Sequence, residues 1–240
     1  MIPEYKNRLK APVSEVFFSY QGEGPFFGKP QIFVRFYGCN ISCNYCDTPL
    51  ENYTETGIET LLKRIKLLFL KNKNIFESHD SAGVVLTGGE PMMHADFLLV
   101  LARKLKKMRL NVMLETNGIL YAGLGKLIKY IDTVSMDIKL PSGCRSNYFA
   151  EHRRFLRSAP NKTYVKIVVA EDTRDKEVFD AVELVSSVSA NIPFVFQPVT
   201  PQGKIHAPSQ NDLIKWVNSA EKKLNNVYLI PQLHKIWKIK

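Results

Sequence analysis

Apolar residues recur along the chain in two patterns, short runs typical of buried strands and stripes spaced as on one face of a helix. A strand-like segment at residues 12–20 ends in a turn at residues 21–25. Further strand-like runs lie at residues 31–37, 83–87, 111–115, 133–138, 163–169, 193–196 and 227–229. Helical stripes lie between them, at residues 61–69, 97–108, 124–131, 148–156, 178–185 and 213–224. Alternating elements of this kind predict a parallel sheet with helices outside it.

The number of strand–helix units separates two architectures that the pattern fits almost equally well. A doubly wound sheet and a barrel both place helices outside a parallel sheet, but the chain has too few units for a complete eightfold barrel. We therefore predict an α/β fold, a partial (β/α) barrel with parallel strands. Because no linker or low-complexity segment interrupts the pattern, residues 1–240 are predicted to form a single domain.

Composition excludes several classes of protein. Hydrophobic residues make up 45% of the chain and charged residues 23%, which is ordinary for a folded globular protein and excludes intrinsic disorder. The first residues lack the apolar core of a signal peptide, and no apolar run approaches the length needed to cross a bilayer. We therefore expect no membrane partner and a cytoplasmic location, where clustered thiols stay reduced.

The net charge is strongly positive. The chain has 33 Lys and Arg residues against 23 Asp and Glu residues, a formal net charge of +10, which would permit binding to nucleic acid. The basic residues are spread over the predicted helices, however, and the interleaved aromatic and basic pattern of an RNA-binding module is absent from the sequence. Solvated helix faces explain this charge, and no stable nucleic-acid partner is expected.

Three of the four cysteines, Cys39, Cys43 and Cys46, fall within eight positions. This spacing is too tight for an easy disulfide and indicates a metal or cluster site. An iron–sulfur cubane held by three cysteines would leave one iron open for a ligand that is not protein. A structural zinc site would instead need a fourth protein ligand. The spacing alone leaves both interpretations open, and the candidates for a fourth ligand are Cys144, His79, His94 and His152.

A glycine pair and a carboxylate follow the predicted strand at residues 83–87, at the edge where parallel βα folds bind ligands. Gly88 and Gly89 allow a ligand to approach bare backbone. Glu90 offers a carboxylate suited to an ammonium group. The alternative for the glycine pair is a simple turn.

Other strands also carry polar residues toward the same edge. Ser135, Asp137 and Lys139 share one face of the strand predicted at residues 133–138, and Gln197 follows a later strand. Polar side chains on a buried strand cost free energy unless they have partners, so these residues are candidates for ligand contacts.

Two residues nearer the amino terminus are further candidates. Glu23 lies in a loop shaped by two glycines and a proline, for which a simple hairpin connection is the alternative. Arg35 shares a strand face with Cys39 if the strand runs regularly. A buried arginine needs an anionic partner, either a structural carboxylate or the carboxylate of a ligand. We favour the ligand because the guanidinium fork matches a carboxylate.

The motifs around the cysteines resemble those of the radical S-adenosylmethionine (SAM) superfamily. The resemblance rests on Cys-x3-Cys-x2-Cys after the first barrel strand, on the aromatic Tyr45 just before the last cysteine, and on Gly88-Gly89-Glu90-Pro91 after the second strand. In that superfamily, the amino and carboxylate groups of SAM chelate the open iron of a 4Fe–4S cluster. The resemblance therefore implies that the three cysteines hold the cluster and that Gly88, Gly89 and Glu90 meet the amino group of SAM.

A longer set of motifs resembles the 7-carboxy-7-deazaguanine synthase family over nearly the whole chain. The shortness of the chain fits the abridged barrel of that family. Residues 142–144 do not align with it, and we interpret Cys144 as an incidental thiol. The motifs are Ser19-x-Gln21-Gly22-Glu23-Gly24, Gly28-x-Pro30, Phe33-x-Arg35, Gly38-Cys39-Asn40, Cys46-Asp47-Thr48, Glu115-Thr116-Asn117-Gly118, Asp137-x-Lys139 and Gln232-Leu233-His234-Lys235.

The resemblance implies an enzyme, a radical SAM carbon–nitrogen lyase. The family converts 6-carboxy-5,6,7,8-tetrahydropterin to 7-carboxy-7-deazaguanine with loss of ammonia, in deazapurine and queuosine biosynthesis. One electron from the cluster cleaves SAM, and the resulting 5′-deoxyadenosyl radical takes a hydrogen atom from C6 of the substrate. After rearrangement the radical recovers hydrogen, so SAM is reused as a cofactor.

The resemblance also implies roles for individual residues. Arg35 would bind the substrate carboxylate, and Glu23, with Gln21 nearby, would accept hydrogen bonds from the pterin nitrogens. Thr48 would be the protein ligand of the Mg²⁺ that members of the family need. Gln232 and His234 are expected only to close the structure. The remaining candidates for SAM contacts are Tyr45, Ser135, Asp137 and Gln197.

The cofactors implied are thus a 4Fe–4S cluster, SAM and Mg²⁺. The implied partners are reduced flavodoxin or ferredoxin as electron donor and a second copy of the chain in a homodimer. Two other functions compete with this one. A glycyl-radical-enzyme activase shares the cysteine motif and Gly-Gly-Glu, but residues 21–24 and Thr48 argue against it. A zinc-stabilised RNA-binding protein would use the +10 charge and contain zinc instead of iron and sulfide.

Overall fold

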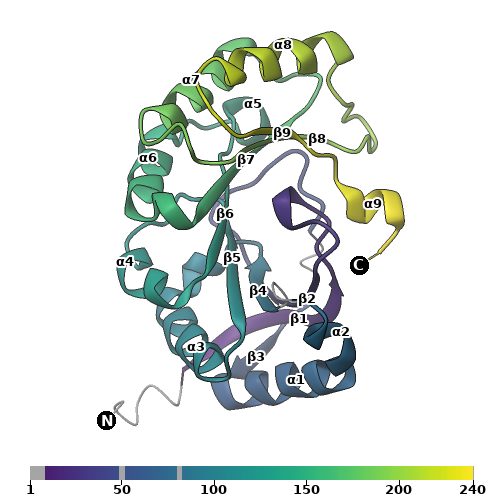
Figure 1. The fold of residues 1–240 in the computed structure, drawn as a ribbon, viewed down its shortest axis with the longest axis vertical. Coiled ribbons are helices and arrows are strands. Elements are labelled where there is room, and N and C mark those ends of the chain that lie inside the picture. Colours follow the sequence, from purple (N-terminus) through teal and green to yellow (C-terminus); the bar gives the residue numbers. More distant parts are fainter. Residues whose placement is uncertain (1–8, 49–51, 80–82, 240) are drawn as a thin grey trace.

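The computed structural model describes residues 9–48, 52–79 and 83–239, and its described strands form one nine-stranded sheet (Figure 1). The strands are β1 (Lys10–Tyr20), β2 (Pro30–Phe36), β3 (Thr54–Gly57), β4 (Gly83–Gly88), β5 (Asn111–Thr116), β6 (Thr133–Asp137), β7 (Thr163–Val169), β8 (Phe194–Pro198) and β9 (Val227–Leu229). Their order in the sheet is β3-β1-β2-β4-β5-β6-β7-β8-β9.

Helices connect the strands and cover the outside of the sheet (Figure 1). The α-helices are α1 (Ile58–Lys71), α2 (Lys73–Glu77), α3 (Ala95–Lys107), α4 (Leu124–Leu127), α5 (Pro141–Cys144), α6 (Phe149–Ser158), α7 (Asp175–Ser186), α8 (Gln210–Glu221) and α9 (Leu233–Trp237). Short 3-10 turns are η2 (Gly24–Phe26), η3 (Pro91–His94), η4 (Ile128–Tyr130) and η5 (Pro160–Lys162).

Every neighbouring pair from β2 to β9 is parallel, and the two edge strands β3 and β9 do not pair with each other. The sheet is therefore a partial barrel left open between its edges, which confirms the predicted α/β fold. The single-domain boundary at residues 1–240 stays a prediction.

The amino-terminal edge of the sheet is antiparallel, and the hairpin connection considered as the alternative at residues 21–25 is the one found. β1 is antiparallel to both β2 and β3. The connection from β1 to β2 spans only residues 21–29, and a parallel pairing needs a crossover of about a dozen residues or more. β3 was not predicted, because its sequence Thr-Glu-Thr-Gly contains no apolar residue.

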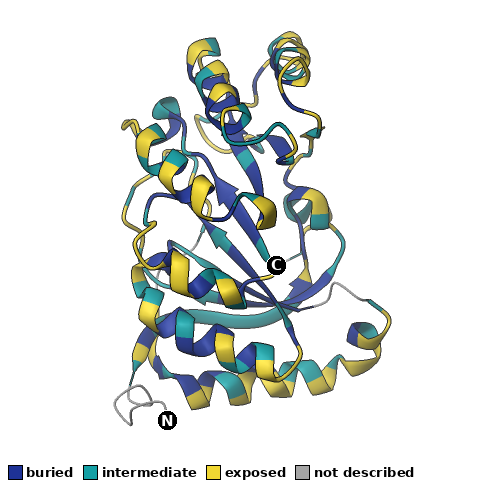
Figure 2. Ribbon diagram, turned by 60° about the vertical axis from the view of Figure 1, so that its left-hand side comes forward, coloured by how far each residue is buried: buried dark blue, intermediate teal, exposed yellow. Residues whose placement is uncertain are grey.

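The core has two layers, because successive strand residues point to opposite faces of the sheet. Val84 and Leu86 of β4 pack into the large cluster beneath the helices. Val85, between them, joins Phe33, Met113 and other residues in a smaller cluster inside the barrel. The helices turn their buried stripes toward the sheet and leave their outer faces exposed (Figure 2). Strands covered on both faces in this way support the carboxyl-terminal edge of the sheet.

Gly125 offers a test of this helical layer. It is exposed within α4, and a Cβ added there would meet no atom within 4 Å. Gly125→Ala is expected to raise the free energy of unfolding by roughly 0.5–1 kcal/mol, because alanine loses less backbone entropy on folding. Denaturant titration of the two proteins measures this difference. An unchanged or lowered midpoint would contradict the helical backbone assigned to α4.

Candidate active site

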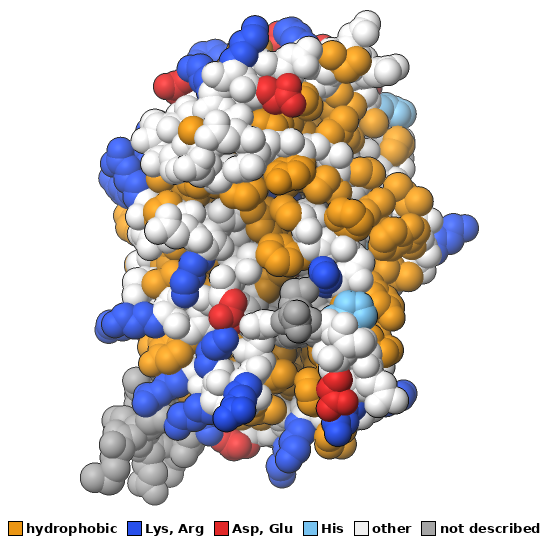
Figure 3. All heavy atoms as spheres, viewed as in Figure 1, with side chains coloured by type: hydrophobic (Ala, Val, Ile, Leu, Met, Phe, Trp, Pro, Cys, Tyr) orange, Lys and Arg blue, Asp and Glu red, His pale blue; other side chains and the backbone are white. Residues whose placement is uncertain are grey.

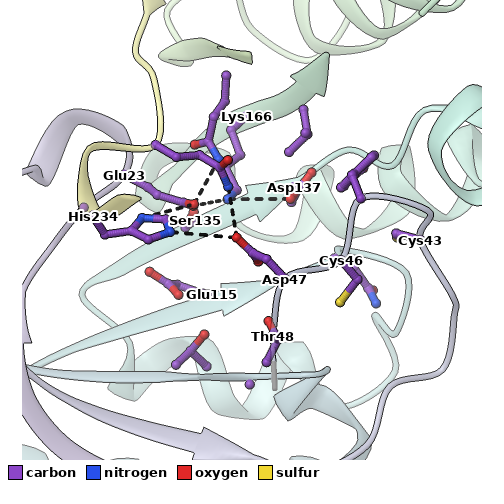
Figure 4. Close-up of a pocket in the computed structure, with 18 of the residues that line it drawn as sticks. Glu23, Cys43, Cys46, Asp47, Thr48, Glu115, Ser135, Asp137, Lys166 and His234 are labelled. Carbon is purple, nitrogen blue, oxygen red and sulfur yellow. Dashed lines mark hydrogen bonds and ion pairs between the residues drawn. The ribbon is translucent and has the colours of Figure 1, made fainter. Parts of the chain in front are cut away.

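A cavity of about 610 Å³ lies at the carboxyl ends of the parallel strands. Its walls come from β2 and from β4 to β8, from the loop after β1, from the loop that carries the clustered cysteines, and from the carboxyl-terminal α9. Figure 4 shows charged side chains from these separate elements turned toward one another. The fold thus gathers residues from both ends of the chain into one site.

Residues 38–48, here named the cysteine loop, form one wall of this cavity. Cys39, Cys43 and Cys46 all line the cavity, and all are free thiols. The loop starts at Gly38, whose φ of 87° lies in a region that favours glycine. That the three cysteines hold one cluster stays a prediction.

The cysteine loop is fastened to α5. The Asn44 backbone N–H donates to the Gly143 carbonyl at 2.9 Å, and its side chain donates to the Ser142 carbonyl at 3.4 Å. The Tyr45 ring lies so close to Gly143 that an added Cβ would come within 2.3 Å of it. Tyr45 also lies 5.3 Å from the Lys139 ammonium, measured to the ring centroid. Residues 142–144, which the sequence left unassigned, therefore support the cysteine loop.

The Cys39 and Cys43 thiols are protonated at neutral pH unless a metal binds. Burial raises the pKa of Cys39 and raises that of Cys43 to about 11. Within the described ranges, no three His, Cys, Asp or Glu side chains converge on a single metal ion. Cys144 donates instead to the Leu140 and Ser146 carbonyls at 3.4 and 3.2 Å. The described residues thus assemble neither a three-cysteine cluster site nor the closed four-ligand geometry of a structural zinc site.

Gly88 and Gly89 line the cavity, as predicted, but Glu90 does not. The Glu90 side chain is fully buried, and its carboxylate accepts hydrogen bonds from Met92 N–H at 2.8 Å, Thr116 Oγ1 at 2.8 Å and Asn117 N–H at 2.7 Å. Burial raises its pKa to about 7. In this structure Glu90 holds the glycine pair against the end of β5, and its contact with the amino group of SAM stays a prediction.

β6 supplies the row of polar residues that its sequence predicted. Ser135, Asp137 and Lys139 all line the cavity, and Lys139 Nζ donates to Asp137 Oδ2 at 2.8 Å. Asp137 Oδ1 is buried and has no hydrogen-bond partner among the described residues. A buried acceptor without a partner costs free energy, so this atom is suited to a donor on a ligand.

Glu23 and Gln197 also line the cavity, and they contact each other. Gln197 Nε2 donates to Glu23 Oε1 at 2.9 Å, and Lys166 Nζ pairs with Glu23 Oε2. Although burial opposes ionisation, the charge of Lys166 lowers the pKa of Glu23. The sequence analysis missed Lys166, although a single lysine within the apolar strand β7 is unusual and could have marked it.

Gln21 is held by a second carboxylate that the sequence analysis did not select. Gln21 Nε2 donates to Glu115 Oε1 at 2.8 Å and to Gln31 Oε1 at 3.1 Å. Burial, together with the nearby charge of Glu23, raises the pKa of Glu115. Glu115 belongs to a motif quoted above, but its position inside the cavity required the structure.

Arg35 lines the cavity with its side chain 18% exposed. Its guanidinium carbon lies 5.3 Å from the centroid of the Phe17 ring, and its Nη1 lies 3.5 Å from Glu15 Oε2. The position of Arg35 is thus compatible with either anionic partner. Glu15 is a structural carboxylate beside it, and the guanidinium also faces the cavity, where a ligand carboxylate would bind. Phe17 fixes the plane of the guanidinium.

Thr48 lines the cavity next to Asp47, which ties the cysteine loop to the carboxyl terminus. Asp47 Oδ2 lies 2.8 Å from Lys235 Nζ, 3.8 Å from His234 Nε2 and 3.3 Å from Gln232 Nε2. Although burial opposes ionisation, hydrogen bonds and charge from His234 and Lys235 hold the pKa of Asp47 well below its usual range. Gln232 and His234 line the cavity, so they are part of the site as well as closing the structure.

Comparisons with known proteins agree with this site. A family model described as the radical SAM superfamily matches residues 33–183. A 7-carboxy-7-deazaguanine synthase from Geobacter sulfurreducens is 36% identical over 94% of this chain and 96% of its own length. The enzyme of the same name from Methanocaldococcus jannaschii is 30% identical over 93% of this chain and 98% of its own.

A solved structure is also similar to this chain. The crystal structure of QueE from Escherichia coli superimposes with a TM-score of 0.64 at 22% identity, covering 96% of this chain and 97% of that one. At this identity the likeness shows the fold alone.

None of the helices in the described part of the chain is both long and apolar enough to span a membrane.

Proposed function

Because the chain belongs to the radical SAM superfamily and, within it, to the 7-carboxy-7-deazaguanine synthase family, we propose that it converts 6-carboxy-5,6,7,8-tetrahydropterin to 7-carboxy-7-deazaguanine with loss of ammonia. The observation that carries the proposal is one cavity that combines three free cysteines with Arg35, Glu23 and Glu115. The first set suits a cluster, and the second suits a substrate with one carboxylate and several N–H donors. The activase and zinc-protein alternatives do not account for the relatives.

The cysteine side of the cavity fits a 4Fe–4S cluster with bound SAM. The three clustered cysteines line the cavity, and a cubane held by three cysteines keeps one iron open for a cofactor. Gly88 and Gly89 offer bare backbone, and Asp137 Oδ1 is an unused buried acceptor. When bound, these cofactors supply the one-electron chemistry that removes a hydrogen atom from the substrate. We assign their contacts to Tyr45, Gly88, Gly89, Ser135, Asp137 and Gln197, with Glu90 supporting the glycine pair from behind.

The opposite side of the cavity fits the pterin. Arg35 is placed to bind the carboxylate, because its guanidinium is oriented by Phe17 and faces the cavity. Glu23 and Glu115 supply carboxylate acceptors for ring N–H and amino groups, and Gln21 holds Glu115 in place. Polar groups that the protein already holds in place orient the substrate before the reaction. They also replace the water molecules that hydrate the substrate in solution.

An anaerobic assay tests the function. The reconstituted protein is mixed with dithionite, SAM, Mg²⁺ and 6-carboxytetrahydropterin, and products are followed by mass spectrometry. The expected result is 7-carboxy-7-deazaguanine with SAM regenerated. Formation of 5′-deoxyadenosine alone would retain the superfamily and refute the substrate, whereas no product from an intact cluster would refute the enzymatic function.

Arg35→Met tests the carboxylate site. The variant keeps an apolar stem on Phe17 but loses the charged hydrogen bonds, so KM for the pterin is expected to rise by roughly 10- to 100-fold. SAM affinity should stay within about twofold, because Arg35 belongs to the substrate side. Arg35→Lys should recover part of the loss. Steady-state kinetics measure both constants, and an unchanged KM would remove Arg35 from the substrate site.

We also propose that Thr48 is the protein ligand of Mg²⁺. Its side chain faces the cavity and makes no hydrogen bond to a described residue, whereas the neighbouring Asp47 is already paired. One hydroxyl together with substrate oxygens and water suits an ion that keeps several waters. Thr48→Val should raise the Mg²⁺ concentration for half-maximal activity by roughly tenfold or more. Thr48→Ser should not, and equal Mg²⁺ dependence in all three proteins would refute this assignment.

For the electron donor we propose a reduced flavodoxin or ferredoxin. Cys39, Asn40, Ser42 and Asn44 are exposed, so the cysteine loop is open to a partner, and the chain carries a net charge of +10. An acidic carrier would be steered toward such a surface. Association with an acidic flavodoxin should therefore weaken as ionic strength rises, and insensitivity to salt would refute electrostatic steering.

We further propose a homodimer that works in the cytoplasm. Exposed apolar side chains gather near the end of the chain, among them Tyr228, Leu229, Ile236 and Trp237. Figure 3 shows hydrophobic side chains concentrated on this face over β8, β9 and α9. Such a surface is typical of subunit contacts. Light scattering measures the mass, and a monomer at micromolar concentration would refute the dimer.

Reduced thiols at the cavity favour a reducing compartment.

A further inference from the structure

Lys166 lies between two carboxylates that belong to different sides of the cavity. It extends from the middle of β7, and its ammonium pairs with Glu23 of the loop after β1. The same Nζ lies 3.6 Å from Asp137 Oδ2 of β6. Figure 4 shows the Lys166 ammonium joined to both carboxylates. In the proposed function, Glu23 contacts the substrate and Asp137 contacts the cofactor.

The pairing continues as an alternating row of charges. Lys139, Asp137, Lys166 and Glu23 follow one another as cation, anion, cation and anion, and their side chains are 11–20% exposed. Buried charges are tolerated when they are paired, and removing one member leaves its neighbour uncompensated. Although burial opposes protonation, Glu23 and Asp137 raise the pKa of Lys166, so it stays cationic. A single ammonium therefore helps to keep Glu23 ionised and links the orientations of the two acids.

Two acceptor atoms beside Lys166 remain available to a ligand. Asp137 Oδ1 is buried without a partner among the described residues, and so is the amide oxygen Oε1 of Gln197. Lys166 pairs with the other oxygen of Asp137, Oδ2, and with Glu23 Oε2, whereas Glu23 Oε1 accepts from the Gln197 amide. The lysine thus restrains both acids without filling Asp137 Oδ1.

We propose that Lys166 is a positioning residue that couples substrate binding to cofactor binding, an inference that rests on the proposed function. A ligand that orders Glu23 also orders Lys166 and, through it, Asp137. The second ligand then meets a side chain whose freedom has already been lost, and it binds more tightly. Because coupling between binding sites is reciprocal, each ligand raises the affinity for the other by the same factor. Such coupling favours cofactor cleavage when substrate is present and limits unproductive cleavage without it.

Binding measurements without a reductant test the coupling apart from turnover. SAM is titrated calorimetrically into anaerobic, cluster-loaded protein, with and without 6-carboxytetrahydropterin. In the wild type, the pterin is expected to tighten SAM binding by roughly tenfold. In Lys166→Met this enhancement should disappear, while SAM and pterin each bind more weakly on their own.

Lys139→Met is the matched control. Lys139, like Lys166, is a half-buried lysine near Asp137, but the structure records no contact between it and Glu23. Its loss should weaken SAM binding and leave the enhancement by pterin in place. Lys166→Arg keeps the charge and should restore part of the coupling. Thermal unfolding shows that each variant is folded, and iron content shows that it carries the cluster. If Lys166→Met does not fold, the double variant Lys166→Met, Glu23→Gln removes both charges of that ion pair.

The pH dependence of pterin binding distinguishes a positioning role of Lys166 from a general loss of structure in Lys166→Met. Glu23 faces Lys166 of β7, Gln197 of β8, Glu115 of β5, Asp47 of the cysteine loop and His234 of α9. Without Lys166, burial and the charges of Asp47 and Glu115 favour the protonated acid. Pterin binding to Lys166→Met should therefore recover as pH rises, because only the ionised carboxylate accepts from the ring.

The outcomes distinguish the two proposals. If the wild type neither binds nor converts the pterin, the proposed function fails. If it does both, but pterin leaves SAM affinity unchanged, or if Lys166→Met keeps the enhancement, the coupling is refuted while the function stands. A pH profile of Lys166→Met that is parallel to the wild-type profile would also overturn the role given to Lys166.

Discussion

Cys43→Ala is expected to lose the iron–sulfur cluster and all SAM cleavage while the chain still folds. Cys43 is only partly buried, faces the cavity, and is one of three thiols available to the cluster there. Removing it leaves two cysteines, too few to hold a cubane by three irons. Because no strand or helix contains Cys43, the cost in unfolding free energy should be small, about 1 kcal/mol or less.

Iron and sulfide analysis of anaerobically reconstituted protein measures the loss of the cluster in Cys43→Ala. Formation of 5′-deoxyadenosine measures the loss of SAM cleavage. Cys144→Ala is the control, because its thiol is buried and donates to two carbonyls of its own turn. That variant should keep the cluster and the activity, and lose roughly 1 kcal/mol of stability. A cluster retained in Cys43→Ala, or lost in Cys144→Ala, would reverse the assignment of these two cysteines.

The parallel part of the fold was predictable because its signal is local. Each run of apolar residues from β4 onward specifies a strand, and each stripe between them specifies a helix that covers the sheet. β3 carries no such signal, since only its pairing with β1 makes Thr54–Gly57 a strand. The antiparallel direction of β1 follows from its short connection to β2, for which the sequence offered a simple hairpin as the alternative.

The site was predictable where residues lie at strand ends or close together in sequence. This group contains Cys39, Cys43, Cys46, Gly88 and Asp137, and all of them line the cavity. The contact between Lys166 and Glu23 spans 143 positions, so no local pattern could reveal it. The same holds for Asp47 and Lys235, which meet only because the carboxyl terminus returns to the cysteine loop.

Glu90 illustrates the opposite difficulty, a residue whose type suggests ligand binding but whose hydrogen bonds serve the fold. The sequence analysis matched its carboxylate to an ammonium group. In the structure, three donors from the protein already occupy its two oxygens. Residue type indicates what a group is able to bind, whereas burial and neighbouring donors decide what it does bind. The glycines before it show how closely the backbone is packed at this point.

Gly89→Ala is expected to abolish cofactor binding by displacing the cysteine loop. A Cβ at this position would lie 2.0 Å from the Gly38 carbonyl oxygen and 3.1 Å from the Cys39 backbone nitrogen. The Gly38 carbonyl also accepts a 2.8 Å hydrogen bond from the Glu90 N–H, so it cannot retreat without breaking that bond. Overpacking of this kind costs roughly 1–3 kcal/mol of stability.

The functional loss should exceed the loss of stability, because a displacement of about 1 Å at a reacting centre can cost on the order of a hundredfold in rate. SAM affinity and turnover should therefore fall together by that factor or more, in protein that still unfolds cooperatively. Gly125→Ala is the matched substitution, since its added Cβ meets no atom within 4 Å and it lies away from the cavity. Wild-type SAM affinity in Gly89→Ala would show that the cysteine loop does not depend on this close approach.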